Sequence, residues 1–272
     1  MQKLSMKLTL YAVCGGAFGL FVRWMQDQIA FDELGLPTGG FWNVAIIALI
    51  VAAAVVYLRF SDELKQEHYH GDKNFCDALK NEGKLYKIIR IALGVLMCAG
   101  GLILIATTRV EKEEKFLLAL GLTAVAAGIG FPVLLGSANT GEERSTARGF
   151  CALAPVIMCA VWLVTIYKIN DISSIVWGFG VQIICVGTAM FSFFRVSGFV
   201  FDTPDTFRSI FACMFGTFMC MLAAADENFL GMKIMLFASA GMLAYYNWVL
   251  VMNLHQGKAP ERKPVNDGFE RL

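Results

Sequence analysis

The sequence is poor in charged residues. Only 17% of its 272 residues are charged and 57% are apolar, whereas about a quarter of a soluble domain is charged. The charges are also segregated, so that long stretches contain none. The segments between these stretches are too short to hold a sizeable soluble domain. The formal net charge of +1 does not point to a nucleic-acid partner.

The sequence also lacks the short motifs of common catalytic and metal sites. It has no GxSxG elbow, no HExxH pair and no GxGxxG after a strand. The segment from His68 to Asp72, with Cys76 nearby, matches no structural zinc spacing and is interpreted as a solvated loop. Met and Cys in the apolar runs are interpreted as packing residues rather than copper(I) ligands. No cofactor, metal site or catalytic residue is predicted.

Eight apolar runs make up most of the chain. Each approaches the roughly 20 residues that a helix needs to cross a bilayer core. Backbone polar groups in lipid must be satisfied within the segment, so these runs are predicted to be helices. The fold class is therefore an all-α integral membrane bundle with about eight transmembrane helices, placed at about 6–23, 41–59, 87–107, 116–136, 150–167, 174–194, 208–225 and 232–254. The charged tail, 255–272, is predicted to be disordered and cytoplasmic.

Lys and Arg are divided unevenly between the segments that connect these helices. If the N-terminus is cytoplasmic, 17 of the 23 basic residues fall in inner segments and 6 in outer ones. This bias predicts a multi-pass protein with both termini in the cytoplasm. Arg23, Arg90 and Lys233 lie near predicted helix ends, where their long side chains are expected to reach the membrane interface.

Three Met-Cys pairs, at 97–98, 158–159 and 219–220, are spaced by 61 residues. Each pair falls midway along an odd-numbered predicted helix, a pattern that favours four stacked helical-hairpin repeats. Regular helix and loop lengths would produce the same spacing, so duplication of a hairpin is a hypothesis.

Two connecting segments are long. The outer one, 24–40, carries Asp32 and Glu33, which are candidates for an external ligand site, although a solvated loop is the alternative. The inner one, 60–86, is highly charged. It is predicted to contain a short surface helix with Phe75, Leu79 and Leu85 on its apolar side.

Polar residues at membrane depth are few. Gln182 and Asn247 could line a path for a neutral solute, but such residues also hydrogen-bond between helices. No ionisable residue lies in the middle of a predicted helix, which argues against proton- or ion-coupled transport. The first hypothesis is a small transport or export component for a neutral or lipid-like solute. The second is a non-catalytic membrane subunit or sensor, bound to a partner membrane protein or to copies of itself.

A pair of carboxylates supports a third hypothesis, a lipid-modifying enzyme. Asp202 and Asp205 could hold a magnesium ion and a phosphorylated lipid, with Arg208 clamping the phosphate. Membrane prenyl- and phosphatidyl-transferases use paired Asp motifs in this way, but their second acidic cluster and longer signatures are missing here. The alternative is helix capping by Asp205 or Thr206 after Pro204.

Two segments carry a resemblance to known proteins. The stretch from Arg23 to Gly40, with Ala30-Phe31-Asp32-Glu33 and Gly35-Leu36-Pro37, and the stretch from Arg195 to Asp226 resemble multi-spanning proteins of anaerobic Gram-positive bacteria. The resemblance covers about a quarter of the chain and implies a bacterial plasma membrane. No activity is attached to that group, so the resemblance implies no site residues.

Overall fold

The computed structural model describes residues 2–29, 40–71, 74–108, 114–140, 146–169, 176–226 and 229–256. The long helices within these ranges are α1 (Gln2–Ile29), α2 (Phe41–Gln66), α4 (Lys84–Thr108), α5 (Glu114–Thr140), α6 (Thr146–Ile169), α7 (Val176–Ser197), α8 (Thr206–Ala223) and α9 (Leu230–Met252). The short elements are β1 (Tyr69–Gly71), α3 (Phe75–Leu79) and β2 (Leu254–Gln256).

All eight long helices of the described chain are long and apolar enough to cross a membrane. The prediction of an all-α polytopic membrane protein is therefore confirmed. Several helices extend beyond the apolar runs. The helix predicted at 6–23 spans Gln2–Ile29, and the one predicted at 41–59 continues to Gln66. Helix formation does not stop where the apolar run stops, because polar residues such as Glu63, Lys65 and Gln66 are good helix formers in water.

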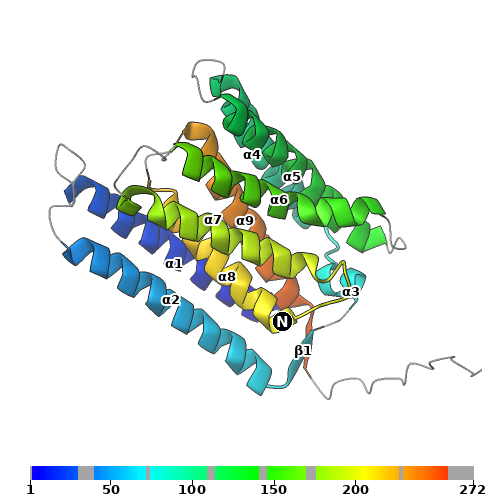
Figure 1. Cartoon of the computed structure of the whole chain (residues 1–272). Coiled ribbons are helices and arrows are strands. Elements are labelled where there is room, and N and C mark those ends of the chain that lie inside the picture. The colour runs from blue at the N-terminus through cyan, green and yellow to red at the C-terminus, as the bar shows by residue number, and fades with distance from the viewer. Residues whose placement is uncertain are drawn as a thin grey trace, which may run out of the picture.

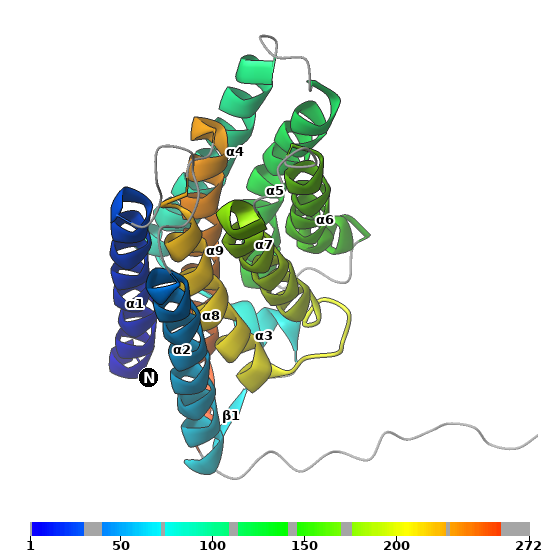
Figure 2. The same ribbon diagram turned by 60° about the vertical axis from the view of Figure 1, so that its left-hand side comes forward.

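The centre of the bundle is formed by α8 and α9. Burial covers 72% of the apolar span of α9 and 67% of that of α8, but only 11% of that of α2. Helices α1 and α2 lie on one side of this central pair, and α4, α5 and α6 lie on the other (Figures 1 and 2). Helix α2 packs mainly against α8, so most of its surface is left to the surroundings.

Three of the four predicted hairpins are packed pairs. Helices α4 and α5, α6 and α7, and α8 and α9 each pack against one another, whereas α1 and α2 both lean on α8 and share few contacts. The α4–α5 contact depends on glycine: a Cβ at Gly128 would lie 2.7 Å from the carbonyl oxygen of Gly94. Small residues allow this close approach of two helix backbones. Whether the hairpins arose by duplication stays a hypothesis.

The Met residues of the three Met-Cys pairs are all fully buried. Met97, Met158 and Met219 are each 0% exposed. The cysteines that follow them differ in burial: Cys159 and Cys220 are buried, whereas Cys98 is half-buried. The flexible methionine side chain is suited to filling irregular gaps between helices.

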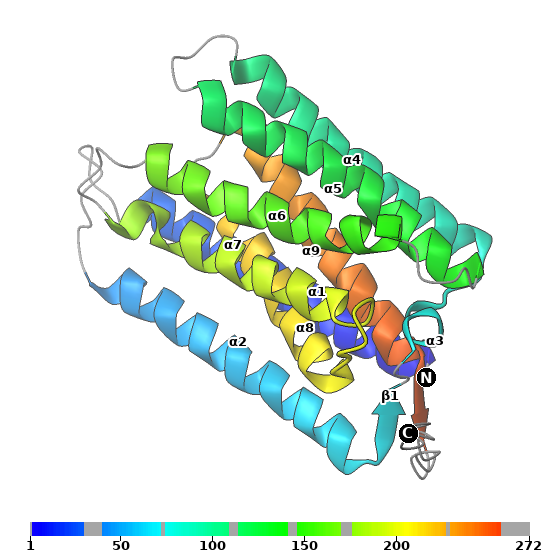
Figure 3. The same ribbon diagram turned by 45° about the vertical axis from the view of Figure 1, so that its right-hand side comes forward.

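Helix α1 begins and α9 ends at the same end of the bundle, which we call the terminal end; the other is the distal end (Figure 3). At the terminal end, β1 and β2 pair antiparallel. The tail was predicted from 255, but His255 and Gln256 belong to β2, and 257–272 lie outside the described residues.

The predicted surface helix in 60–86 is present as α3, with one error. Phe75 and Leu79 are buried as expected. Leu85 is 65% exposed and belongs to α4, so its assignment to the apolar side was wrong. The reason is local: α3 ends at Leu79 and the chain becomes extended at Lys80 before the next helix begins.

Candidate functional site

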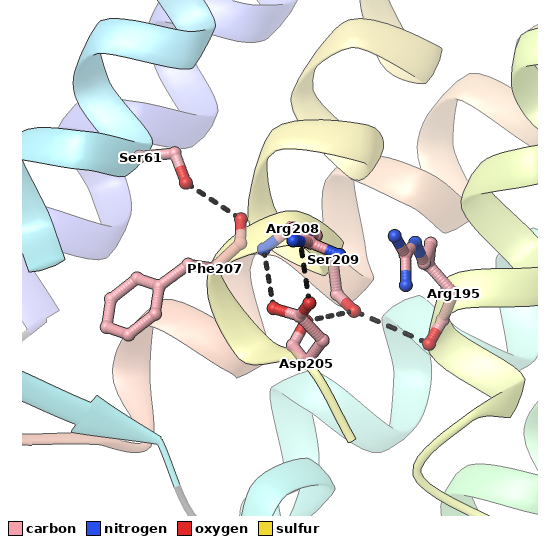
Figure 4. Close-up of polar contacts among 6 residues, drawn as sticks. All are labelled: Ser61, Arg195, Asp205, Phe207, Arg208 and Ser209. Carbon is pink, nitrogen blue, oxygen red and sulfur yellow. Dashed lines mark hydrogen bonds and ion pairs between the residues drawn. The ribbon is translucent and has the colours of Figure 1, made fainter. Parts of the chain in front are cut away.

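The loop between α7 and α8 holds the two carboxylates singled out by the sequence, and Figure 4 shows one of them, Asp205. Asp205 is the N-cap of α8. Its Oδ1 accepts a hydrogen bond from the Arg208 backbone N–H at 3.3 Å, and its Oδ2 lies 3.2 Å from Arg208 Nε. Asp205 therefore caps the helix and pairs with the arginine predicted to clamp a phosphate. Ser209 Oγ donates to the Asp205 carbonyl oxygen at 2.7 Å and fixes the same turn.

Asp202 lies apart from this cap, in a left-handed conformation with φ 55°. It lines an open pocket of about 510 Å³ formed with the start of α6. Arg148 of that pocket is nearly buried, and its guanidinium carbon lies 4.8 Å from the centre of the Phe75 ring. Neither Asp205 nor Arg208 lines this pocket. The structure thus places Asp202 in a pocket and Asp205 in a helix cap.

The two polar residues proposed for a solute path lie in different helices. Gln182 is buried in α7. Asn247 is buried in α9, and its Nδ2 donates to Thr9 Oγ1 of α1 at 3.0 Å. This bond links the first and last long helices. Neither residue lines the cavity described next. Asp32 and Glu33 lie outside the described residues.

A cavity of about 260 Å³ lies between α1, α2 and α7 near the distal end. Its walls are apolar: Ile46, Ile47 and Ile50 line it from α2, and Gly180, Val181 and Ile184 line it from α7. Ile47 is 48% exposed and Ile184 is 53% exposed, so the cavity is open to the bundle surface. We call it the lateral cavity. Its volume is slightly below the about 300–1,000 Å³ of small-molecule pockets.

A network of polar side chains meets the lateral cavity. Arg23 Nε donates to Asp226 Oδ1 at 2.7 Å, and Arg23 Nη1 donates to Gln26 Oε1 at 2.6 Å. Gln26 Nε2 in turn donates to Asn43 Oδ1 at 2.7 Å. The network therefore joins α1, the start of α2 and the turn that follows α8. Arg23, Gln26 and Asn43 also line the cavity.

The Arg23 side chain, expected at the membrane interface, is enclosed by protein. Its side chain is 4% exposed, and that of Asp226 is 3% exposed. The first helix continues to Ile29, which leaves Arg23 inside the bundle rather than at the end of the helix. A buried guanidinium requires an anionic partner, and Asp226 provides it.

Gln26, Asn43 and Asp226 could not be recognised as site residues from the sequence. No local motif marks them, because their partners lie far away in the chain: Arg23 and Asp226 are separated by 203 positions. The sequence offers one signal: Arg23 and Asp226 lie at the ends of two apolar runs, on the same predicted side of the membrane.

The arrangement of the lateral cavity suits an amphipathic molecule. Apolar walls favour a hydrocarbon chain, since each buried methylene contributes about 0.8 kcal/mol. The amides of Gln26 and Asn43 are donors and acceptors that can orient a polar group. Arg23 and Asp226 carry opposite charges, so the described members of the network have no net charge.

Comparison with models of protein families, with curated proteins and with solved structures finds no match to this chain.

Proposed function

We propose that the protein is a small transport or export component for a lipid-like or neutral solute and that the lateral cavity binds this solute. The observation that carries the proposal is the apolar cavity between α2 and α7, which meets a buried polar network with no net charge at its distal end. A hydrocarbon chain fits between the isoleucines, and a neutral polar group fits beside the amides of Gln26 and Asn43.

The position of α2 supports entry of the solute from the lipid phase. Helices α2 and α7 flank the cavity without packing closely against each other, and α2 is the least buried of the eight long helices. An amphipathic molecule can therefore enter sideways between them. Following the distribution of Lys and Arg, we place the terminal end in the cytoplasm and the distal end outside a cell membrane.

The residues predicted from the sequence have different places in this proposal. Gln182 follows Val181, which lines the cavity, but does not line the cavity itself, so we leave it out of the proposed site. Asn247 bonds to Thr9 and is assigned to the packing of α9 on α1. The enzyme hypothesis has less support, because both Asp205 oxygens are engaged by Arg208 and Asp202 lines a separate pocket.

Native mass spectrometry of the gently extracted protein tests the proposal. Gly180 lines the cavity, and nothing lies within 4 Å of a Cβ built there, so Gly180→Phe fills the cavity. Gly187 on the same helix is equally open but does not line the cavity, so Gly187→Phe is the matched control. We expect the wild type and Gly187→Phe to retain an amphipathic molecule that Gly180→Phe loses. The identified molecule is then followed across reconstituted vesicles, where we expect flux for the wild type and little for Gly180→Phe.

Two results would overturn the proposal. One is retention of the same molecule by Gly180→Phe at the wild-type level. The other is a wild type that retains no amphipathic molecule and instead carries a second protein at a fixed ratio. The latter would favour the subunit hypothesis, for which the exposed, apolar α2 is the natural contact surface.

A further inference from the structure

The small sheet at the terminal end brings together histidines from distant parts of the chain. The sequence contains only 3 His. His70 lies in β1 and His255 lies in β2, and the antiparallel register places these two residues directly opposite each other. His68 immediately precedes β1. The segment from His68 to Asp72 carries no zinc spacing by itself, but the pairing of the strands adds an imidazole from 185 residues away.

The sheet directs both imidazoles to the face turned away from the bundle. Leu254, the neighbour of His255, is 1% exposed and packs into the core. Successive side chains of a strand point to opposite faces, so His255 and its partner His70 point the other way. Their burial agrees with this, because His255 is exposed and His70 is only half-buried.

The backbone that carries the histidines is held in place. Leu254 anchors β2 in the core, and Tyr69 of β1 packs against the same core. Gly71 follows His70, and a Cβ at this position would collide with the side chain of Thr206 at the start of α8. The sheet is therefore seated against the bundle on one side and carries the histidine pair on the other.

The spacing of directly opposite residues matches the requirements of one metal ion. Their Cβ atoms lie about 4.5–5.5 Å apart in an antiparallel pair. Two imidazole nitrogens on one tetrahedral zinc ion are each about 2.0–2.1 Å from the metal and hence roughly 3.3 Å from each other. Two histidine side chains that lean together from opposed Cβ atoms can meet this distance.

We infer that His70 and His255 form a binding site for a divalent transition metal ion, for which Zn²⁺ is the probe of choice. Imidazole ligands favour zinc, copper and nickel over magnesium and calcium, which prefer oxygen. The described ranges bring no three His, Cys, Asp or Glu side chains together in metal-binding geometry. This inference is independent of the proposed solute site.

A metal ion bound here would cross-link β1, which follows α2, to β2, which follows α9. Helix α2 has few other attachments: it packs mainly against α8 and makes smaller contacts with α1 and β1. The metal would therefore stiffen the position of the helix that forms one wall of the lateral cavity. Because protons compete with metals for imidazole nitrogen, binding would weaken on acidification.

The test measures Zn²⁺ binding by the full chain, purified without a polyhistidine tag, in competition with a fluorescent chelator. We expect one Zn²⁺ per chain, with Mg²⁺ giving no signal. His70→Ala and His255→Ala should each weaken binding by at least roughly tenfold, since changes in outer-shell partners alone cost 10–100-fold. The matched control, His68→Ala, should change affinity by less than about threefold, because His68 lies outside the paired register.

A second variant tests the geometry separately. Opposed Cα atoms in an antiparallel pair are about 4.5 or 5.5 Å apart, within the 4.4–6.8 Å that a disulfide spans. His70→Cys with His255→Cys should therefore form an intramolecular disulfide on mild oxidation. Failure to form it would show that the two residues are not opposed and would overturn the inference. Equal Zn²⁺ affinity of the wild type, His70→Ala and His255→Ala would also overturn it, as would an equal loss in His68→Ala.

Discussion

The buried Arg23–Asp226 pair gives the most direct test of how the distal end is held together. Asp226→Asn keeps the size of the side chain and removes its charge. The Arg23 guanidinium, whose side chain is 4% exposed, then loses its counter-charge in an apolar setting. Breaking a buried ion pair by removing one partner costs about 3–5 kcal/mol. We expect a loss of that size in the free energy of unfolding.

The assay is equilibrium unfolding of the purified protein in mixed micelles with increasing denaturing detergent. Glu82→Gln is the control, because Glu82 lies 3.0 Å from Lys80 in an ion pair whose two side chains are 69% and 53% exposed. Solvent screens such a pair, so its loss should change stability little. The double variant Arg23→Met with Asp226→Leu replaces the buried pair by apolar groups and should recover most of the loss.

Two outcomes would refute this reasoning. If Asp226→Asn is no more destabilising than Glu82→Gln, the pair is not buried as described. If the double variant is as unstable as Asp226→Asn, the cost does not arise from an uncompensated charge.

Three further predictions concern packing and capping. Gly128→Val should destabilise the protein by about 1–3 kcal/mol through overpacking against α4, whereas Gly136→Val on the same helix should have a small effect because its nearest neighbour is 3.8 Å away; equal losses in detergent unfolding would contradict this. Asp205→Ala should lower the free energy of unfolding by about 0.5–2 kcal/mol, whereas Asp205→Asn should change it little, since Asn is an equally good N-cap. The enzyme hypothesis predicts instead that Asp205→Asn abolishes function at unchanged stability. Gly71→Ala should lower the melting temperature, because the new methyl group would collide with the Thr206 side chain. Adding Thr206→Ala to this variant should restore part of the loss. A double variant as unstable as Gly71→Ala would show that Thr206 is not the residue that the methyl group meets.

The helices of this protein could be predicted because each depends on a local property of the chain. An apolar run of sufficient length must form a helix in lipid, whatever its neighbours are. The cap at Asp205 could be predicted for the same reason, since the sequence Pro204-Asp205-Thr206 carries the signal of a helix start. The predicted positions of helix ends were less accurate where polar helix-forming residues continue the helix beyond the apolar run, as in α2.

The candidate site could not be predicted, because it depends on which helices become neighbours. Gln26 and Asn43 carry no motif, and Arg23 resembles any basic residue near the end of an apolar run. Their roles follow from the packing of α1, α2 and α7 around one cavity and from the arrival of Asp226 beside Arg23. The histidine pair could not be predicted for the same reason, because β1 and β2 come from distant parts of the sequence.

The packing of α1 has a consequence for biosynthesis. This helix is synthesised before α2 to α7, whereas its partners α8 and α9 are synthesised after them. Ser5 Oγ of α1 donates to the Trp248 carbonyl oxygen, 243 residues further along the chain. The nascent α1 and α2 must therefore wait in the bilayer while the α4–α5 and α6–α7 hairpins form from local contacts. Contacts between such distant segments are slow to form. A ribosome that stalls before α8 leaves both early helices unattached, so quality-control proteases should recognise chains truncated there far more readily than chains that have reached β2.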